Sequence, residues 1–436
     1  MTLIEYGFLQ TQDKKDDNYI SPKTFAEIEN FVLKNEETAQ YLKLTTKRGY
    51  GKVLQAQNYV GVIQTKDGAT IEILPKIHNT DSDKAGTKEI LIDMLKTLKN
   101  SPFRSLHTAH LKSTKIPLFE IFISMFLEEL TVLVRKGIKS DYIQKEDNLK
   151  FLKGKLKINE QIKRNYIHKE RFFVEYQEYV SDRIENRLIK TTLQYLYKKS
   201  KSTTNKRRIR EFLFVFDEVG ISRNIKIDFT KVRLNRQMRG YEQVLLWCKT
   251  FLLGNSFSPY RGSDVAFALL FDMNLLFESY VYNYLKKSGD YETITAQDKG
   301  YHLAYLNGRD AKFKLKPDIV IDKEKDNPII IDTKWKILSE SKSYQGISQS
   351  DMYQLYAYGT KYKNCSQMYL IYPMDQIREE NGNYYEYYKD SDRKLNLKVL
   401  FFDVAKSHKK QNFKLDIYHT ENMGNSNALR KQTKYQ

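Results

Sequence analysis

Two short apolar runs, each bordered by an aspartate, constrain the fold of this chain more than any other feature. The run Lys-Pro-Asp-Ile-Val-Ile contains Asp318, and three later isoleucines lead into Asp332, Thr333 and Lys334. A polar connector, residues 323–328, separates the runs. Apolar runs of this length are typical of buried strands, and a short connector favours an antiparallel hairpin. We therefore expect a buried hairpin with charged residues at one end.

Alternation along a strand decides which of these charges share a face. Asp332 and Lys334 are expected on one face, while Thr333 points away. An antiparallel hairpin brings Asp318 beside them, although a shift of one residue would put Asp318 on the opposite face. The pattern predicts two carboxylates and one ammonium group at a single site.

This combination suits the hydrolysis of a phosphodiester, which requires an activated water and neutralisation of charge on the phosphoryl oxygens. Carboxylates can hold Mg²⁺, which prefers oxygen ligands and keeps several waters. We expect Asp318 and Asp332 to be ligands of Mg²⁺, with Mn²⁺ as an alternative. Lys334 is expected to orient the attacking water or to stabilise the developing negative charge.

Two further segments supply candidate supports for this site. Glu278, beside Phe277 on a predicted helix, is the candidate third metal ligand, and its alternative interpretation is an exposed helical glutamate. Gln354 and Tyr358, four positions apart on a later helix, share one face and could reach the metal-bound water or a DNA backbone. Their alternative interpretation is an ordinary helix flank. A triplet of the type Asp-Xaa-Lys also occurs by chance, so the hypothesis depends on the whole ordered set.

Several other chemistries lack their motifs. The segment Gly-Tyr-Gly-Lys at 49–52 is not a phosphate-binding loop, so the chain is not expected to hydrolyse nucleotides. Cys248 and Cys365 are the only cysteines, too few for a zinc ribbon or a four-cysteine iron-sulfur cluster. With two distant cysteines and no signal-like apolar run at the N-terminus, a cytoplasmic protein is expected. The apolar stretch 117–134 contains three glutamates and is interpreted as a buried helix.

Charge points to a polyanionic partner. The 436 residues carry a formal net charge of +19, and residues 151–210 alone contain 17 Lys or Arg and 6 Asp or Glu. Lysine and arginine that neutralise phosphates release condensed counterions, so nucleic acid is the leading candidate. An acidic protein surface fits the same stretch, and a bias toward Lys, Asn, Ile and Tyr from an AT-rich genome explains part of the composition.

The length predicts two or three domains in a multidomain α+β protein. We expect a small β-rich N-terminal module at 1–80, a mainly helical basic region at 81–258, an α/β core at 259–420 and a polar tail at 421–436. The N-terminal module should contain a helix after Ser21 and a hairpin with its turn at 66–68. The best linker candidate is 254–264. The core is expected to contain helices at 267–287 and 351–360, and strands at 291–295, 313–322, 329–335, 367–372 and 395–404.

The ordered motifs resemble a known family, the PD-(D/E)xK nucleases, and within it the McrC subunit of McrBC-type, modification-dependent restriction systems. The resemblance covers roughly residues 90–405. It rests on Leu-Lys-Gly-Lys-Leu at 152–156, Glu-Asn-Arg-Leu-Ile-Lys at 185–190, Leu-Phe-Glu at 276–278, Pro-Asp at 317–318 with Asp-Thr-Lys at 332–334, and Tyr-Gln-Leu at 353–355. The segments 59–63 and 71–77 resemble the front module of longer members.

The resemblance implies that 259–420 is a PD-(D/E)xK restriction-endonuclease-like core acting on double-stranded DNA. It also implies a McrB-type AAA+ GTPase hexamer as partner, which translocates DNA, and whose GTP hydrolysis McrC stimulates after inserting its non-nuclease part into the hexamer pore. Two nuclease subunits are expected to meet in the assembled complex. Two alternatives stay open: a non-cleaving DNA-binding scaffold that activates a AAA+ partner, and a free-standing RecB-like exonuclease.

Overall fold

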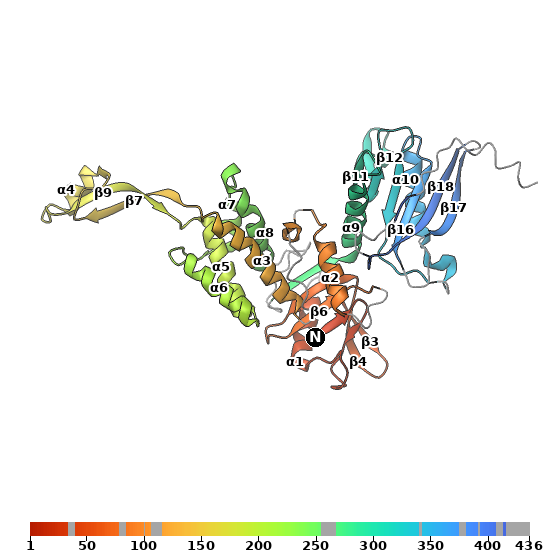
Figure 1. Cartoon of the computed structure of the whole chain (residues 1–436), viewed down its shortest axis with the longest axis horizontal. Coiled ribbons are helices and arrows are strands. Elements are labelled where there is room, and N and C mark those ends of the chain that lie inside the picture. Colours follow the sequence, from red (N-terminus) through yellow and green to blue (C-terminus); the bar gives the residue numbers. More distant parts are fainter. Residues whose placement is uncertain are drawn as a thin grey trace, which may run out of the picture. The chain divides into compact units, whose positions relative to one another are not determined.

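The computed structural model describes residues 1–33, 40–77, 84–99, 101–105, 116–253, 267–339, 342–374, 381–390, 393–406 and 413–415. Over these ranges the protein is mixed α+β, with ten α-helices and five sheets (Figure 1). The chain divides into two units, Met1–Tyr291 with Thr333–Trp335, and Glu292–Asp332 with Lys336–Gln436. The predicted linker at 254–264 and the predicted tail at 421–436 lie outside the described residues.

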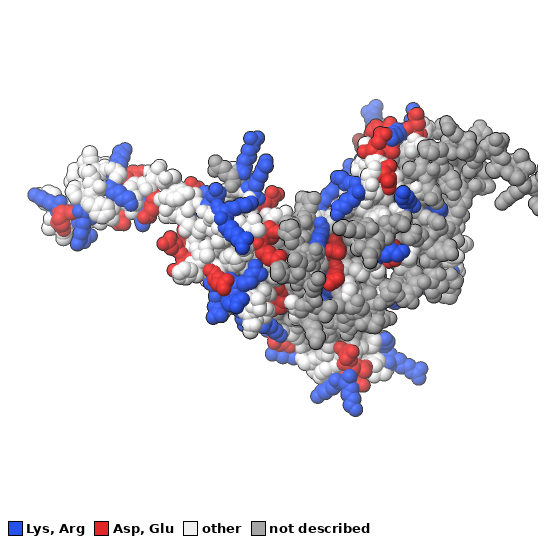
Figure 2. Space-filling view, in the orientation of Figure 1, with Lys and Arg blue, Asp and Glu red and all other residues white. Residues whose placement is uncertain are grey.

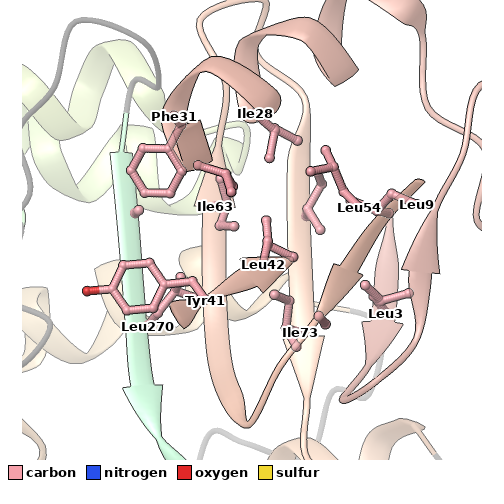
Figure 3. Close-up of a cluster of buried hydrophobic side chains, with 14 of the residues drawn as sticks. Leu3, Leu9, Ile28, Phe31, Tyr41, Leu42, Leu54, Ile63, Ile73 and Leu270 are labelled. Carbon is pink, nitrogen blue, oxygen red and sulfur yellow. The ribbon is translucent and has the colours of Figure 1, made fainter. Parts of the chain in front are cut away.

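The first unit begins with two small sheets and one helix. The larger sheet has the order β1-β6-β5-β10, and the smaller has the order β2-β4-β3. The bounds are β1 Thr2–Ile4, β2 Phe8–Leu9, α1 Pro22–Leu33, β3 Leu42–Lys47, β4 Gly51–Ala56, β5 Tyr59–Gln64, β6 Thr70–Leu74 and β10 Phe267–Asp272. Side chains from both sheets and α1 fill one core, which includes Ile28, Leu42, Ile63 and Leu270 (Figure 3).

The predicted helix and hairpin of this module are confirmed. The backbone N–H of Thr24 donates to Ser21 Oγ over 3.1 Å, so Ser21 caps α1. The turn between β5 and β6 includes Gly68 at φ +85°, a conformation that glycine adopts without steric cost. Both features depend on residues close together in the sequence.

The helix predicted over 267–287 is wrong in its first six residues. Residues 267–272 form β10, and the helix α9 begins only afterwards, at Met273–Ser288. Strand β10 pairs antiparallel with β5, with Leu270 opposite Gly61. The continuous apolar run at 267–272 is compatible with either a helix or a buried strand. Pairing with β5, some two hundred residues earlier in the sequence, makes it a strand.

A helical body follows the N-terminal sheets. Its elements are α2 Lys84–Leu95, η2 Pro102–Ser105, α3 Leu118–Arg135, α5 Ile184–Lys199, α6 Thr203–Val215, α7 Ile225–Lys231, η4 Arg236–Met238 and α8 Arg239–Leu253. Helix α3 confirms the buried helix predicted over 117–134, with Glu120 5% exposed. Its carboxylate accepts hydrogen bonds from Ser200 Oγ and Asn205 Nδ2, both over 2.8 Å, which ties α3 to α6. In the described part of the chain, each helix is too short or too polar to cross a membrane.

A three-stranded sheet interrupts the region that was predicted to be mainly helical. It comprises β7 Asp141–Leu149, β8 Lys155–Leu156 and β9 Phe172–Val180 in the order β7-β9-β8, with the short helix α4 Ile158–Arg164 between β8 and β9. We call residues 141–180 the arm (Figure 1). Arg183 Nη1 donates to Asp141 Oδ2 over 2.8 Å at its base. Strand β7 is largely exposed and gives no apolar alternation in the sequence, whereas β9 buries Phe173, Val174 and Tyr176.

The second unit contains a six-stranded sheet of order β11-β14-β15-β16-β18-β17. The bounds are β11 Ile294–Ala296, β14 Ile319–Ile321, β15 Ile329–Thr333, β16 Gln367–Pro373, β17 Asn381–Asp390 and β18 Arg393–Phe402, with helix α10 Gln349–Lys361 and the 3₁₀ turn η5 Ser343–Gly346. Strands β12 His302–Leu306 and β13 Asp310–Lys314 form a separate two-stranded sheet. The helix predicted over 351–360 and the strands predicted over 367–372 and 395–404 are therefore confirmed.

Buried apolar residues from the sheet and from α10 form the core of the second unit, including Val320, Ile330, Leu355 and Leu370. The strand predicted over 313–322 is in fact two strands with a break at 315–318. The break falls at Pro317, which has no N–H to donate to a sheet ladder. It places Asp318 directly before β14, at the end of the sheet.

Candidate active site

The central hairpin has the register that the sequence analysis required. Ile319 pairs with Ile331, and Val320 pairs with Ile330, in an antiparallel ladder. Continuing this register by one step places Asp318 opposite Asp332. Residues directly opposite each other in an antiparallel pair share a face of the sheet. The two aspartates therefore lie on one face at the same end of the hairpin.

Burial differs along the triplet. Asp332 is 1% exposed and Thr333 is 4% exposed, whereas Asp318 and Lys334 are half-buried. Strand β15 ends at Thr333, so Lys334 follows the last strand residue. A carboxylate as deeply buried as that of Asp332 is costly unless a cation or hydrogen-bond donors balance it.

A buried tyrosine on the neighbouring strand β16 faces the same region. Tyr372 is fully buried. Burial raises the pKa of its phenol, and the negative charges of Asp351 and Asp332 raise it further. Asp351 lies in the first turn of α10. Tyr372 could not be found from the sequence because only the order of strands places β16 beside β15. Asp351 could not be found because only the packing of α10 brings its charge near Tyr372.

The predicted pair on α10 is linked to the aspartate hairpin by hydrogen bonds. Gln354 Nε2 donates to Tyr358 Oη over 2.6 Å, and Tyr358 Oη donates to the backbone carbonyl of Lys316 over 3.2 Å. Lys316 precedes Pro317 and Asp318 in the chain. Tyr358 is 4% exposed, so a core residue positions the segment that leads into strand β14.

Glu278 and Lys334 belong to segments of the first unit that pack together. Glu278 is half-buried on α9, next to the fully buried Phe277. The Phe277 ring lies 5.4 Å, centroid to centroid, from that of Trp335, the residue after Lys334. The backbone N–H of Trp335 donates to Asn274 Oδ1 over 3.3 Å, also on α9. Helix α9 thus anchors the segment that carries Lys334.

A buried carboxylate near the N-terminus also anchors Trp335. The indole Nε1 donates to both carboxylate oxygens of Glu5, over 3.2 and 3.0 Å, and the backbone N–H of Lys76 donates to Glu5 Oε2 over 2.8 Å. Burial raises the pKa of Glu5 to about 7, and the nearby charge of Asp272 contributes to the rise. No local pattern marks Glu5 for this role, since its partner lies more than three hundred positions away in the sequence.

The donor set of the hairpin suits a hard divalent cation. Carboxylate oxygens are the preferred protein ligands of Mg²⁺, which often uses only one or two of them and keeps waters in its other positions. Across the described ranges, three or more His, Cys, Asp or Glu side chains do not gather closely enough to hold a metal ion. The carboxylates of Asp318 and Asp332 have the chemistry that Mg²⁺ prefers, and a Mg²⁺ site at this pair, with Glu278 as a third ligand, stays a prediction.

Comparisons with known proteins add a family to this geometry. The family model described as "McrBC 5-methylcytosine restriction system component" matches residues 54–373, more than half of the chain. Among solved structures, a chain of the refined half-complex from the tetradecameric assembly of Thermococcus gammatolerans McrB AAA+ hexamers with bound McrC has a TM-score of 0.68 and 20% identity. The match covers 95% of this chain and 96% of that chain, and at this identity it shows a shared fold.

A second solved structure, the cryo-EM structure of the Thermococcus gammatolerans McrBC complex, has a TM-score of 0.47 and 22% identity, over 67% of this chain and 89% of that chain. The comparison with curated proteins found no match. The family match runs from within β4 through the helical body and the aspartate hairpin to the end of β16, which confirms the resemblance seen in the sequence. The chain belongs to the McrC family, the McrBC 5-methylcytosine restriction system component.

Proposed function

We propose that this chain is the Mg²⁺-dependent endonuclease subunit of a McrBC-like restriction complex and cleaves double-stranded DNA together with a McrB-type AAA+ GTPase hexamer. The observation that carries the proposal is the hairpin register, which aligns Asp318 with Asp332 two residues before Lys334. Family membership supports the same reaction, because McrC is the nuclease component of such systems.

Each residue of the site has a distinct role in the proposed reaction. Asp318 and Asp332 would hold Mg²⁺ or Mn²⁺, and the bound ion would supply charge neutralisation at the phosphoryl oxygens and a water of lowered pKa. The Lys334 ammonium orients the attacking water or stabilises negative charge on the phosphate.

The supporting residues act through position. Gln354 donates toward the water or the DNA backbone, while Tyr358 holds both Gln354 and the carbonyl before Pro317. Glu278 is proposed as a further oxygen ligand from α9.

The arm is the proposed contact with the AAA+ partner. Two exposed isoleucines, Ile158 at 65% and Ile162 at 62%, lie four residues apart on α4 and so share one face of that helix. Tyr166 and Ile167, in the connection to β9, are 79% and 84% exposed. Exposed apolar residues gathered in one segment are typical of protein interaction sites. We propose that the arm enters the hexamer pore and stimulates GTP hydrolysis.

The helical body offers a surface for DNA. Figure 2 shows Lys and Arg side chains gathered over α6, where Lys206, Arg207, Arg208 and Arg210 lie. Such a concentration of positive charge suits phosphate contacts. We propose that this surface guides DNA and that two copies of the complex meet through their nuclease units to cut both strands.

Replacement of Asp332 by Asn, or of Lys334 by Ala, tests the site. Each variant should lower DNA cleavage by the reconstituted complex at least about a hundred-fold in the presence of Mg²⁺ and GTP, as expected for groups that stabilise transition-state charge. Assembly with the partner and stimulation of GTP hydrolysis should persist. Asp326→Asn, on the exposed connector of the same hairpin, is the matched control and should cleave normally.

The outcome separates the proposed endonuclease from its alternatives. Cleavage by both site variants at the wild-type rate would refute the site. Wild-type protein that raises GTP turnover but leaves DNA uncut would support the non-cleaving scaffold. Digestion from DNA ends without a GTPase would support the free-standing exonuclease.

A further inference from the structure

A hairpin outside the main sheet of the second unit leads directly into the proposed active site. Strands β12 and β13 pair only with each other among the described strands. Their turn contains Asn307 at φ +51° and Gly308 at φ +71°, and the backbone N–H of Arg309 donates to the carbonyl of Leu306 over 3.1 Å. Positive φ at both central residues makes this a type I′ turn. The hairpin ends three residues before Pro317 and four before Asp318.

The base of this hairpin is fixed within the second unit. The backbone N–H of Leu315 donates to the carbonyl of Tyr301 over 2.9 Å. The Tyr301 ring lies 4.4 Å from that of Tyr362, which follows the last residue of α10. Leu315 is 7% exposed in the core. The hairpin therefore extends from a rigid base.

Beyond this base the hairpin exposes large apolar side chains. Tyr305 is 59% exposed, Leu306 is 53% exposed and Phe313 is 74% exposed. A two-stranded hairpin gains little stability from residues that bury no surface. An exposed aromatic group of this kind is better explained by a binding partner than by packing.

Phe313 is also held in an unfavourable backbone conformation. Its φ is +53°, which a bulky residue other than glycine rarely adopts. Neither burial nor an aromatic contact with another described residue compensates for it. A residue that costs stability and stays exposed is a candidate for a functional contact.

The charge of the hairpin identifies the partner. Arg309, Lys312, Lys314 and Lys316 stand against the single acid Asp310. In the described structure none of these four cations forms an ion pair. The register pairs Lys314 with His302 and Lys312 with Ala304, so both lysines lie on one face. Exposed cations beside aromatic groups are typical of surfaces that bind nucleic acid.

We propose that the β12–β13 hairpin enters a groove of the DNA duplex next to the phosphodiester that is cut, with Lys312 and Lys314 on one face of the hairpin against phosphates and Phe313 on the other face against the bases. The inference rests on the proposed function, because it makes the hairpin part of the nuclease's substrate-binding surface. Apolar side chains that enter the minor groove beside positive charges open a base step and bend the duplex. Such bending would hold the strand near Asp318.

The experiment uses the full chain assembled with its partner and two hairpin variants. Phe313→Gly removes the aromatic ring, and glycine adopts φ +53° without strain, so thermal stability should be equal to or higher than that of the wild type. DNA affinity should fall about ten-fold. Lys312→Gln combined with Lys314→Gln should lower the slope of log affinity against log salt by about two. Binding is measured with Asp332→Asn in each protein, so that DNA stays intact.

A matched control removes two positive charges elsewhere in the same unit. Lys361 and Lys363 are exposed near the end of α10, and Lys361→Gln with Lys363→Gln should change the salt slope less than the hairpin pair does. Hairpin variants that bind and cut DNA like the wild type would overturn the proposal. So would variants that lose subunit assembly instead of DNA affinity, since the hairpin would then be a protein interface. If the wild type binds DNA through the hairpin but never cuts, the proposed nuclease fails while the DNA contact stands.

Discussion

At the scale of single residues, Glu5 links the N-terminal sheet to the segment that carries Lys334. Glu5 is 2% exposed, and its two carboxylate oxygens share the single indole N–H of Trp335. A pKa of about 7, above the ordinary 4.5, means that the folded protein favours the neutral acid. Burial makes the charged form costly, and the donors from Trp335 and Lys76 offset only part of that cost.

This pKa has a consequence for stability. The folded state holds the proton of Glu5 more tightly than the unfolded state does. The contribution of Glu5 to the free energy of unfolding is therefore largest at low pH and is lost as pH rises from about 4.5 to about 7. Glu5→Gln cannot ionise and keeps an oxygen that can accept from Trp335. Relative to wild type, the variant should therefore gain stability between about pH 5 and about pH 8, as measured by the free energy of unfolding in urea.

Trp335→Phe is the companion variant. Phenylalanine keeps a ring beside Phe277 but loses the donor to Glu5. Since that hydrogen bond lowers the pKa of Glu5, its loss should move the pH-dependent change in stability to higher pH. A pH profile of Glu5→Gln that runs parallel to the wild-type profile would show that Glu5 does not titrate in this range.

At the scale of elements, the entry of β10 into the N-terminal sheet positions α9. Gly61 of β5 lies where β10 passes, with φ +139°, and a Cβ added there would lie 2.1 Å from the carbonyl oxygen of Leu269. Only a glycine lets the two backbones approach this closely. The pairing of β10 with β5 therefore depends on Gly61, which lies in the module at 1–80. Because α9 begins directly after β10, the position of Glu278 depends on the same glycine.

Gly61→Ala should lower the free energy of unfolding by about 3 kcal/mol, because it combines backbone strain with displacement of β10. Cleavage should fall as well, since α9 carries Glu278 and contacts Trp335. Urea denaturation measures the first effect and the DNA cleavage assay the second.

Gly68→Ala is the control for this prediction. Gly68 also has positive φ, at +85°, but no heavy atom lies within 4 Å of an added Cβ. Its replacement should cost only about 1 kcal/mol of backbone strain. Equal losses for the two variants would contradict the close approach of β10 as the cause.

At the scale of the whole molecule, the chain separates proposed partner contact from proposed catalysis by sequence region. The arm lies at 141–180, whereas the paired aspartates lie in the second unit. A change in the arm should therefore alter GTP hydrolysis by the AAA+ partner without altering the hairpin that holds Asp318 and Asp332.

Ile162→Asp tests this separation. A carboxylate on the exposed apolar face of α4 should lower stimulation of GTP hydrolysis about ten-fold or more, because it would become desolvated in the complex. The free chain should unfold at the same temperature, since Ile162 is 62% exposed. Turnover of GTP by the partner with added chain is the measurement.

Ile221→Asp, at an apolar residue outside the arm that is 52% exposed, controls for a general effect of added charge. Normal stimulation by Ile162→Asp, or an equal loss with Ile221→Asp, would show that the face of α4 is not the contact.

Much of the local structure could be predicted from sequence. The cap at Ser21, the turn at Gly68 and the helix over 117–134 depend on residues within a few positions of one another. The pairing of the aspartate hairpin belongs to the same class, because a short connector and two apolar runs favour an antiparallel hairpin. Its register stayed open by one residue in the sequence, and the structure fixes it by placing Ile319 opposite Ile331. The roles of Asp318, Asp332, Lys334, Glu278 and Gln354 stay predictions.

The β12–β13 hairpin was missed although it had a local signal. Asn307-Gly308 is a strong type I′ turn sequence, but the flanking residues lack the alternating apolar pattern of a half-buried strand. Strand β7 of the arm was missed for the same reason, since its first six residues are exposed. An exposed strand does not need alternating apolar residues, so hydrophobic periodicity does not reveal it.

The sequence by itself determined the elements whose partners lie nearby and the chemical groups at their ends, because local backbone preferences and alternation act over a few residues. Only the tertiary structure decided that β10 joins β5, that Tyr372 faces Asp332 and that Trp335 donates to Glu5. These contacts join segments far apart in the chain, and their energies depend on burial and strand order that no local pattern contains.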